Sequence, residues 1–369
     1  MPDPVHTAAW QELAGQAIEP SAPASHAFAS AALEHLPPSQ RPTIYVMTNA
    51  ANEPRGIALL RHDNRRWPPL GRIGSSRWGD FFFLGLPLLH AEQPHHTLRD
   101  LLDITRLVRL AALEFCAVPA NGPFMRTLRE VLAETGTQPV ELVRWQRAML
   151  DATRTPDDWW QQDIGKKRRK EWNRLKRKLA EQGDLSFESL PLDASADELT
   201  AWMDDFLQLE AAGWKGRAGT ALACAAHNKA FARAMTANFH AEGNLRFWRL
   251  RLNGHTIASL FAFISGDALW LGKIAYDENL RAFSPGVLLT IEATRDILAD
   301  EAVRFADSSA DPNHPMIDHL WKQRLELVDV LVPLPGVSAT RFAAITAAER
   351  GYRAARKQAK RLWHMVRRH

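Results

Sequence analysis

The clearest periodic pattern in the chain is a pair of apolar runs on either side of Asn253-Gly254. Asn-Gly between two such runs is a strong signal for a two-residue β-hairpin, so we expect strands over 245–252 and 256–264. A third strand is expected over 268–276, after the turn residues Ser265-Gly266-Asp267. The pattern then predicts a helix at 285–299, a strand at 303–307, a helix at 315–323 and a strand at 325–332.

The first part of the chain shows the same order of elements. Strands are expected over 43–47 and 57–61, and a Gly/Arg/Trp-rich loop over 63–79 leads to a third apolar run at 81–86. The pattern then predicts a helix at 97–109, a strand at 113–118, a helix at 123–134 and a strand at 140–150. Both parts therefore read β-β-β-α-β-α-β. This order predicts an α/β fold of two tandem domains, each with a mixed sheet flanked by helices.

The domain boundaries follow from changes in composition. Residues 1–40, rich in Ala, Pro and Ser with one short helix at 7–16, are predicted to be a loosely structured N-terminal segment. The polar stretch 151–163 contains Pro156 and separates the two domains. The predicted organisation is a first domain at 41–155, a second, catalytic domain at 156–335 and a basic C-terminal helix at 336–369. Further helices are expected at 166–179, 199–212 and 225–241.

Overall composition points to an ordinary globular protein. Hydrophobic residues make up 46% of the chain and charged residues 24%. Cys116 and Cys224 are too few for a disulfide framework or a zinc cluster, so no metal is expected. The chain has no apolar run of about 18–20 residues, the length that a membrane span needs. Its first residues lack the basic flank and apolar stretch of a secretory signal. These observations predict a cytoplasmic location.

The formal net charge of +4 conceals two basic blocks. Residues 166–182 carry nine Lys and Arg against two Glu, and residues 341–369 carry nine against Glu349. The first block could hold a tRNA or the phosphates of coenzyme A. It could equally be a solvated helix face, with Trp172, Leu175 and Leu179 facing inward. The second block could lie on an anionic membrane surface, pack on the domain or form a frayed tail.

The turn between the third strand and the following helix of the second domain is the most informative segment. It reads Arg281-Ala-Phe-Ser284-Pro-Gly286, followed by Val287 and Leu288. Ser284 suits the N-cap, Pro285 suits the first helical turn, and Gly286 would let a ligand approach the backbone. Free N–H groups at a helix start can bind a phosphate, and Arg281 would add a positive charge. The plain alternative is a turn followed by a capped helix.

This turn resembles the segment that binds the pyrophosphate of acyl-CoA in GNAT acyltransferases, whose pattern is Arg/Gln-x-x-Gly-x-Gly/Ala. The first and last positions match, and Ser284 replaces the middle glycine. Residues 166–332 resemble the C-terminal half of the CelD-type acetyltransferases. That GNAT branch is associated with bacterial cellulose biosynthesis and is related to the Fem aminoacyl transferases. The matching stretches are 166–179, Glu210-Ala-Ala-Gly-Trp214-Lys-Gly-Arg-Ala-Gly-Thr220, Lys273-Ile-Ala-Tyr-Asp277, Phe283-Ser-Pro-Gly286, Asp307-Ser-Ser-Ala, His314-Pro-Met and Trp321.

The resemblance implies direct acyl transfer from acyl-CoA, most simply acetyl-CoA. It implies that the donor is bound by Arg281, Ser284, Gly286, Val287 and Leu288. A backbone N–H on the third strand would polarise the thioester carbonyl. The predicted general bases lie at strand ends that face a cleft: Asp307, then Asp277, then His314, with Lys273 as a further catalytic candidate. Each also has a non-catalytic alternative. Asp307 could be an N-cap or form hydrogen bonds within a loop, His314 could simply begin a helix, and Lys273 could lie on a solvated face of the sheet. As a helix-start residue, His314 would have its pKa lowered by the helix dipole.

Glu210, Trp214 and Lys215 lie in a glycine-bounded loop that could close over an acceptor, or Trp214 could fill the core. With Trp270, these residues are the predicted acceptor-binding set. The leading hypothesis is an acyl-CoA-dependent N- or O-acyltransferase acting on a small molecule, a saccharide or an envelope precursor. The alternatives are a Fem-like transferase that uses aminoacyl-tRNA, and a non-catalytic scaffold in a membrane-associated synthesis complex.

Overall fold

The computed structural model describes residues 4–63, 70–79 and 81–366. The chain divides into two compact units. Unit 1 contains residues 1–15, 25–41 and 146–325, and unit 2 contains residues 16–24, 42–145 and 326–369. The division at 145/146 falls ten residues before the predicted boundary, inside a strand rather than in the polar stretch that follows it.

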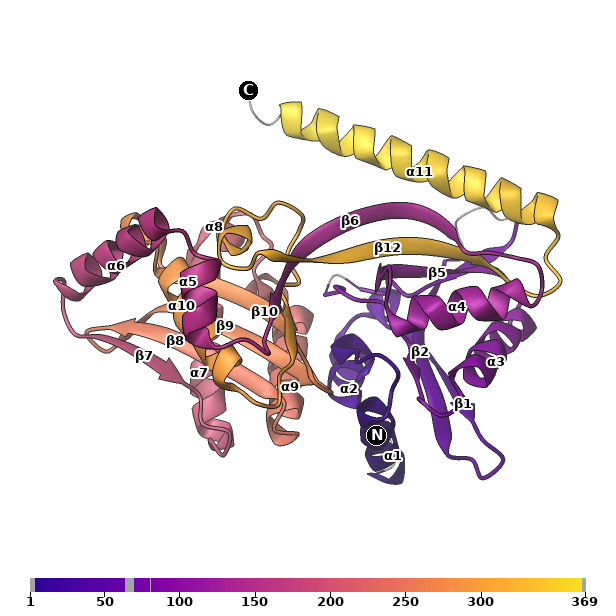
Figure 1. Cartoon of the computed structure of the whole chain (residues 1–369), viewed down its shortest axis with the longest axis horizontal. Coiled ribbons are helices and arrows are strands. Elements are labelled where there is room, and N and C mark those ends of the chain that lie inside the picture. The colour runs from indigo at the N-terminus through magenta and orange to yellow at the C-terminus, as the bar shows by residue number, and fades with distance from the viewer. Residues whose placement is uncertain (1–3, 64–69, 80, 367–369) are drawn as a thin grey trace. The chain divides into compact units, whose positions relative to one another are not determined.

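Unit 1 is built on a mixed sheet that follows the predicted hairpins closely. Its strands lie in the order β6-β11-β10-β9-β8-β7, and Figure 1 labels β7 to β10. Among the described strand pairs of this unit, β10 and β11 are parallel, and β6–β11, β10–β9, β9–β8 and β8–β7 are antiparallel. The strands are β6 (Val140–Asp151), β7 (Leu185–Ser189), β8 (Leu245–Leu252), β9 (His255–Ser265), β10 (Ala268–Tyr276) and β11 (Phe305–Asp307).

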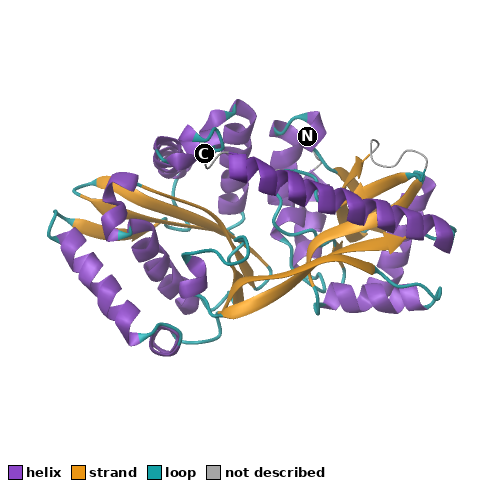
Figure 2. Cartoon of the chain, turned by 90° about the horizontal axis from the view of Figure 1, so that it is seen from above, coloured by secondary structure: helices purple, strands orange, loops and turns teal. Residues whose placement is uncertain are grey.

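Both faces of the unit 1 sheet are apolar. Helices cover both of them (Figure 2). Alternate residues of a strand point to opposite faces. One face packs Leu260 and Leu271 against Leu288 of α10 in a continuous buried cluster. On the other face, Phe261 and Phe263 lie among aromatic rings from the helices. The helices are α5 (Pro156–Gln162), α6 (Lys166–Ala180), α7 (Ala196–Ala212), α8 (Trp214–Arg217), α9 (Ala226–Ala241) and α10 (Pro285–Ala299).

The basic sequence of helix α6 is compatible with its position, because only a narrow stripe of the helix is buried. Leu175 and Leu179 are buried, and Trp172 packs partly buried against the core, as the apolar stripe predicts. Nine of the other twelve positions of the helix carry Lys or Arg, and all of these except the half-buried Arg169 are exposed. The helix is therefore anchored by one narrow stripe and presents a basic surface to solvent.

The N-terminal segment is folded, contrary to the prediction of a loosely structured lead-in. It forms α1 (Pro4–Gly15), α2 (His26–His35) and two short 3-10 helices, Ala22–Ala24 and Pro38–Gln40. Phe28 on α2 is 1% exposed and packs edge to face against Phe231 and Phe263. The Ala-rich composition suits this position, because small side chains let α2 lie close to α9. The sequence suggested weak structure because most buried side chains of this segment are alanines, with Leu13, Phe28 and Leu36 as larger ones.

Unit 2 repeats the strand order of unit 1 with one difference from the prediction. Its strands lie in the order β1-β2-β3-β5-β12-β6, and β4 pairs with β2. The third strand is β3 (Arg72–Ser75), whereas the apolar run 81–86 that was expected to form it is irregular. Part of the loop predicted at 63–79 lies outside the described residues. The other elements are β1 (Thr43–Thr48), β2 (Pro54–Asp63), β4 (Leu88–Leu89), β5 (Leu110–Pro119), β12 (Gln323–Pro333), α3 (Pro94–Leu107) and α4 (Pro123–Ala133).

The last strand of each sequence half pairs with the other half. β6 ends the first half in sequence, yet it pairs with β11 of unit 1. β12 ends the second half, yet it pairs with β5 of unit 2. Each unit therefore has a sheet completed by a strand that lies far away in the sequence, which periodicity alone does not indicate.

The basic C-terminal segment forms one long helix, α11 (Ala339–Val366), drawn in yellow in Figure 1. Arg353 fixes it in unit 2 by ion pairs with the buried carboxylates of Glu114 and Asp329. Ile345 and Glu349 are also buried, whereas the side chains from Ala354 to Ala359 are all exposed. In the part of the chain that the structure describes, no helix has both the length and the apolar character needed to cross a bilayer.

Candidate functional site

The site begins where β10 runs past the end of its neighbour. β10 pairs with β11 only over residues 268–270 and then continues to Tyr276. Its register with β9 shifts between Leu271 and Ile274, so in these ladders Gly272 and Lys273 have no partner residue on either side. Gly272 is required here, because a Cβ at this position would lie 2.4 Å from the Phe261 ring. The irregularity frees main-chain groups in the middle of an otherwise regular strand.

The turn after β10 has the backbone geometry that the sequence pattern calls for. Asp277 caps the 3-10 helix Glu278–Phe283, and its carboxylate accepts a hydrogen bond from the N–H of Asn279 at 2.9 Å. Ser284 then adopts the left-handed conformation, with φ 53° and ψ 52°. Glycine reaches this conformation without steric cost, which explains why the related pattern has a glycine there. The substitution therefore preserves the turn.

Ser284 does not cap α10 through its side chain as the sequence predicted, because no such hydrogen bond forms. Its carbonyl instead accepts hydrogen bonds from the N–H groups of Val287 and Leu288, at 3.0 and 3.1 Å. Arg281 lies on the exposed side of the turn.

Gly286 has a packing role that differs from the prediction. The residue is buried, and a Cβ added to it would lie 3.2 Å from Cδ1 of Tyr276 and 3.5 Å from Cδ1 of Ile274. The glycine therefore lets the first turn of α10 approach β10 closely. The close approach that the sequence suggested for a ligand is made by the protein's own strand.

A buried carboxylate joins the loop after α7 to the irregular part of β10. The Glu210 side chain is 1% exposed, and one of its oxygens accepts hydrogen bonds from Lys215 Nζ at 3.3 Å and Lys273 Nζ at 3.1 Å. Its other oxygen accepts the N–H of Leu222 at 2.7 Å. Lys215 also donates to the carbonyl of Ile274 at 3.2 Å. Burial, and then the like charge of Lys273, lower the pKa of the Lys215 ammonium group.

The loop that carries Trp214 is held next to the turn by Glu278. The Glu278 carboxylate accepts the N–H of Trp214 at 2.6 Å and forms a 2.5 Å ion pair with Arg217. These contacts lower the pKa of Glu278, the bond to Arg217 being the larger cause. The Trp214 side chain is 56% exposed, so it does not fill the core. The loop thus places an exposed aromatic side chain beside the turn that follows β10.

His314 lies in a different local structure from the one predicted. The segment 315–323 contains only the 3-10 helix Ile317–His319, because the residues that follow it begin β12. The imidazole Nδ1 accepts long hydrogen bonds from the N–H groups of Met316 and Ile317, both at 3.4 Å. Burial is the main cause that lowers the pKa of His314, so no helix dipole is needed to explain a neutral imidazole.

Two other predicted residues belong to the interior of unit 1. Asp307 is 0% exposed, forms an ion pair with the buried Arg147 of β6, and accepts the N–H of Ser309 at 2.9 Å. Trp270 is 2% exposed, and its ring lies edge to face on Phe305. The Trp270 side chain is therefore part of the core, and its predicted acceptor contact stays a prediction.

The structure thus joins two sets of residues that the sequence treated separately. Glu210 comes from α7, Lys215 from the short helix α8 and Lys273 from β10, so the loop predicted around Glu210 and Lys215 is largely helical, and the two lysines meet at the Glu210 carboxylate. Sequence reasoning missed Glu278 and Arg147. Glu278 follows directly after the predicted Asp277, so a charged residue in the turn was the available signal. Arg147 gave no signal, because its partner is 160 residues away. Among the described residues, no three His, Cys, Asp or Glu side chains come together in a way that would hold a metal ion.

Comparison with known proteins places this geometry in a fold class. The structure is similar to the C-terminal domain of a putative lysylphosphatidylglycerol synthetase from Agrobacterium fabrum, with a TM-score of 0.56 at 10% identity, over 93% of this chain and 94% of that one. It is also similar to FemX, with a TM-score of 0.56 at 8% identity, over 89% of this chain and 96% of that one. For L-PGS from Bacillus licheniformis the TM-score is 0.53 at 13% identity, over 94% of this chain and 97% of that one. At these identities the likeness concerns the fold. No curated protein matches the chain in sequence.

The match to a family concerns unit 1. Residues 166–312 match the family model of the acetyltransferase (GNAT) domain. The predicted fold class, an α/β protein of two tandem GNAT-like domains with mixed sheets, is confirmed by this match and by the repeated strand order. The chain therefore contains a GNAT acetyltransferase domain in the unit that was predicted to be catalytic, and the protein is a transferase.

Proposed function

We propose that unit 1 transfers an acyl group from acyl-CoA to an amine or hydroxyl of a small-molecule, saccharide or envelope-precursor acceptor. The observation that carries this proposal is the end of β10. There the strand leaves β11, the ladder to β9 is interrupted at Gly272 and Lys273, and two lysines converge on one buried carboxylate. Main-chain N–H groups freed from a ladder can stabilise a carbonyl oxygen that becomes negative during acyl transfer.

The residues of the turn fit an anionic donor such as acyl-CoA. Arg281 is exposed beside the start of α10, and a helix start carries a partial positive charge. The left-handed Ser284 gives the turn the shape of the related glycine pattern. In this proposal the Arg281 side chain and the positive end of α10 hold the donor phosphates, while the N–H groups of Val287 and Leu288 stay bonded to the Ser284 carbonyl. Gly286 contributes by letting α10 pack closely on Tyr276.

In the proposed reaction, the acceptor nitrogen or oxygen forms a bond to the acyl carbon, and the bond from that carbon to the coenzyme A sulfur breaks. The acceptor loses one proton and the departing thiolate gains one. Lys215 is the best-placed proton acceptor. Its neutral amine has two hydrogens, which match its two hydrogen bonds to Glu210 and the Ile274 carbonyl, so its lone pair stays available. The lowered pKa of Lys215 favours this neutral form.

The other predicted bases have geometries that suit different roles. Asp307 is held by Arg147, so we assign it the positioning of β11 against β6. Asp277 caps the turn. The Nδ1 of His314 accepts two N–H groups, so in the neutral ring the hydrogen is on Nε2. That arrangement suits donation of a hydrogen bond to a substrate rather than removal of a proton.

Donor binding is tested by thermal denaturation with acetyl-CoA. Saturable stabilisation is expected, about 2.7 kcal/mol at a concentration 100 times Kd. Arg281→Glu should reduce the affinity at least 10-fold. Lys229→Glu makes the same change of charge at an exposed site on α9, and it should leave the affinity unchanged. Absence of stabilisation by acetyl-CoA and by longer acyl-CoA donors in the unaltered protein would contradict the proposal.

A second donor class, aminoacyl-tRNA, is favoured by one observation. Helix α6 exposes Lys166, Lys167 and Lys170 within a largely basic surface, which could neutralise RNA phosphates. In this alternative the same site transfers an aminoacyl group from the tRNA ester. Binding of tRNA should then weaken steeply with salt, and the combined changes Lys166→Glu, Lys167→Glu and Lys170→Glu should abolish it. Salt-insensitive or absent tRNA binding would remove this alternative.

Peripheral membrane contact through the basic residues 341–369 is a further part of the proposal. Deleting all of them would also remove Arg353 from Glu114 and Asp329, so truncation after Gln358 is the sharper change. The truncated protein should lose binding to phosphatidylglycerol vesicles, while the full chain binds them in a salt-dependent way and ignores neutral vesicles. Vesicle binding without turnover or donor stabilisation would favour a non-catalytic scaffold.

A further inference from the structure

A pocket of unit 1 lies beside the β9–β10 hairpin, at the opposite end of β10 from the turn that holds Ser284. It has a cavity volume of about 360 Å³, within the range of small-molecule sites. α1, the start of α2, the end of α9 and the hairpin all contribute to its wall. β10 has nine residues, and at about 3.4 Å per residue the two ends of the strand lie roughly 30 Å apart. The pocket is therefore separate from the site proposed for acyl transfer.

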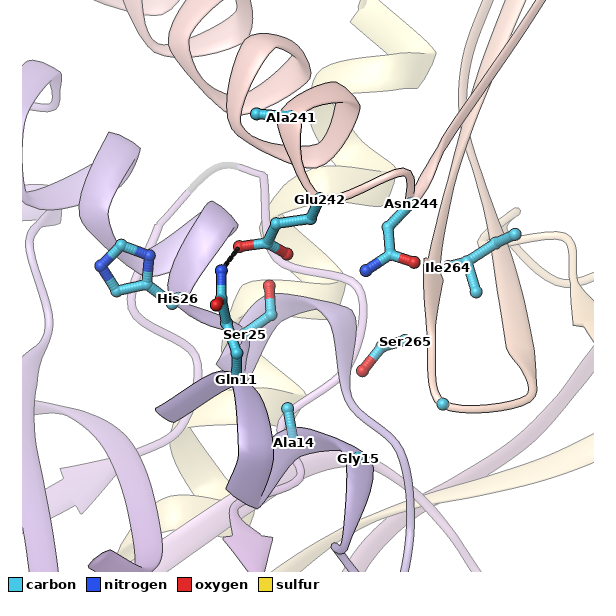
Figure 3. Close-up of a pocket in the computed structure, with 11 residues that line it drawn as sticks. Gln11, Ala14, Gly15, Ser25, His26, Ala241, Glu242, Asn244, Ile264 and Ser265 are labelled. Atoms are coloured by element: carbon cyan, nitrogen blue, oxygen red, sulfur yellow. Dashed lines mark hydrogen bonds between the residues drawn. The ribbon is translucent and has the colours of Figure 1, made fainter. Parts of the chain in front are cut away.

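The polar groups of this pocket converge on one space (Figure 3). The Oγ of Ser265 points into it, as does the Oγ of Ser25, and the side-chain amide of Asn244 lies at the same wall. Ser265 is 4% exposed, and its Oγ is buried without a hydrogen-bond partner. A buried hydroxyl without a partner is costly, and a ligand that supplies a hydrogen-bonding group would remove that cost.

The charge of the pocket is negative. Glu242 is the one acidic residue among the lining residues described. One of its carboxylate oxygens accepts a hydrogen bond from Gln11 Nε2 at 2.9 Å, drawn as a dashed line in Figure 3. The residue is the C-cap of α9, a 16-residue helix, so the partial negative charge of the helix end adds to the carboxylate. His26 is the other titratable residue of the lining, and burial lowers the pKa of its imidazole, so it is neutral at pH 7.

We infer that this pocket binds a small molecule that carries a primary ammonium group together with hydroxyl groups. The ammonium group pairs with the Glu242 carboxylate at the end of α9, and a hydroxyl bonds to the Oγ of Ser265. The small residues Ala14 and Gly15 leave the space that such a ligand fills.

Isothermal titration calorimetry with D-glucosamine and D-glucose tests this inference, because the two probes differ by the ammonium group. Glucosamine should bind saturably and glucose at least 10-fold more weakly, since only glucosamine offers a charged donor to the Glu242 carboxylate. Glu242→Gln should remove the preference for glucosamine while the bond from Gln11 is kept. Ser265→Ala should weaken both probes. Glu181→Gln changes an exposed carboxylate elsewhere in unit 1, and it should have no effect.

Melting curves without ligand show whether each variant is folded, and Ser265→Ala provides a second route if Glu242→Gln is unstable. Glucosamine could also bind at the acyl-transfer site, so Glu210→Gln is measured in parallel. Glucosamine binding lost in Glu210→Gln and kept in Glu242→Gln would overturn the inference, and so would failure of both probes to bind. Acetyl-CoA stabilisation is unaffected by either outcome, so the proposed function is tested separately.

Discussion

The guanidinium group of Arg147 is ion-paired with the carboxylate of Asp307 inside unit 1. The two side chains are 4% and 0% exposed. Arg147 comes from the last strand of the first sequence half and Asp307 from the short strand that it pairs with. The ion pair therefore holds β6 and β11 in register beside the parallel strand β10.

Arg147→Met should destabilise the protein by about 3–5 kcal/mol, because it leaves the Asp307 carboxylate buried without its cation. The measurement is urea denaturation monitored by circular dichroism. Arg147→Met combined with Asp307→Leu should recover most of the loss, since an apolar pair of similar size avoids the unpaired charge. A loss below about 1 kcal/mol in the single variant would show that Asp307 does not depend on Arg147.

Glu210→Gln should lower kcat/KM at least 10-fold, because the site loses the negative charge that holds Lys215 and Lys273. It should also lower the pKa of Lys215 further, since the negative partner that raises it is gone. If neutral Lys215 is the active form, the rise of activity with pH then occurs at lower pH. A pH profile of kcat/KM in which the rise stays at the same pH would exclude Lys215 as the titrating group. Glu181→Gln is the matched control.

Glu278→Gln should loosen the loop at Trp214 and raise KM for the acceptor more than it changes kcat. The carboxylate accepts the Trp214 N–H and pairs with Arg217, and a neutral amide keeps at most the weaker of these bonds. Hydrogen exchange should become faster in residues 213–220 only. If exchange and KM are both unchanged, the loop is held by other contacts.

Ser284→Gly should keep or raise the melting temperature, whereas Ser284→Val should lower it. The left-handed backbone at φ 53° costs a residue with a Cβ about 1–2 kcal/mol, and a β-branched residue tolerates it least. Glycine offsets part of this gain by its larger entropy in the unfolded chain. Donor binding should be retained in Ser284→Gly. A lower melting temperature for the glycine variant would contradict the assigned conformation.

The stability of the protein should fall as the pH is lowered from 7 to 5, and His314→Gln should reduce that fall. The folded pKa of His314 is below its ordinary value of 6.5, so the unfolded chain takes up a proton first. The penalty grows as the pH falls through 6.5 and is complete below the folded pKa. One such group contributes at most about 1.4 kcal/mol per pH unit. An unchanged slope in the variant would place the titration elsewhere, for example at His26, whose pKa is also lowered.

Local patterns in the sequence determined much of unit 1. The bounds of β10 and α10 follow from the alternation of apolar residues and from Pro285, and the structure reproduces both. The apolar stripe of α6 was likewise readable. These features depend on residues within a few positions of one another, so periodicity and turn chemistry are sufficient. The helix predicted at 315–323 was wrong, because a histidine, a proline and a few apolar residues suit an α-helix and a 3-10 turn equally.

Only the tertiary structure decided which distant residues meet. The pairing of β6 with β11 and of β12 with β5 brings Arg147 to Asp307, and the fold brings Glu210 to Lys273. It also turned Trp270 and Gly286 from expected ligand contacts into packing residues. Such contacts depend on strand register and on the closure of long loops. The sequence around each partner therefore does not indicate which distant residue it will contact.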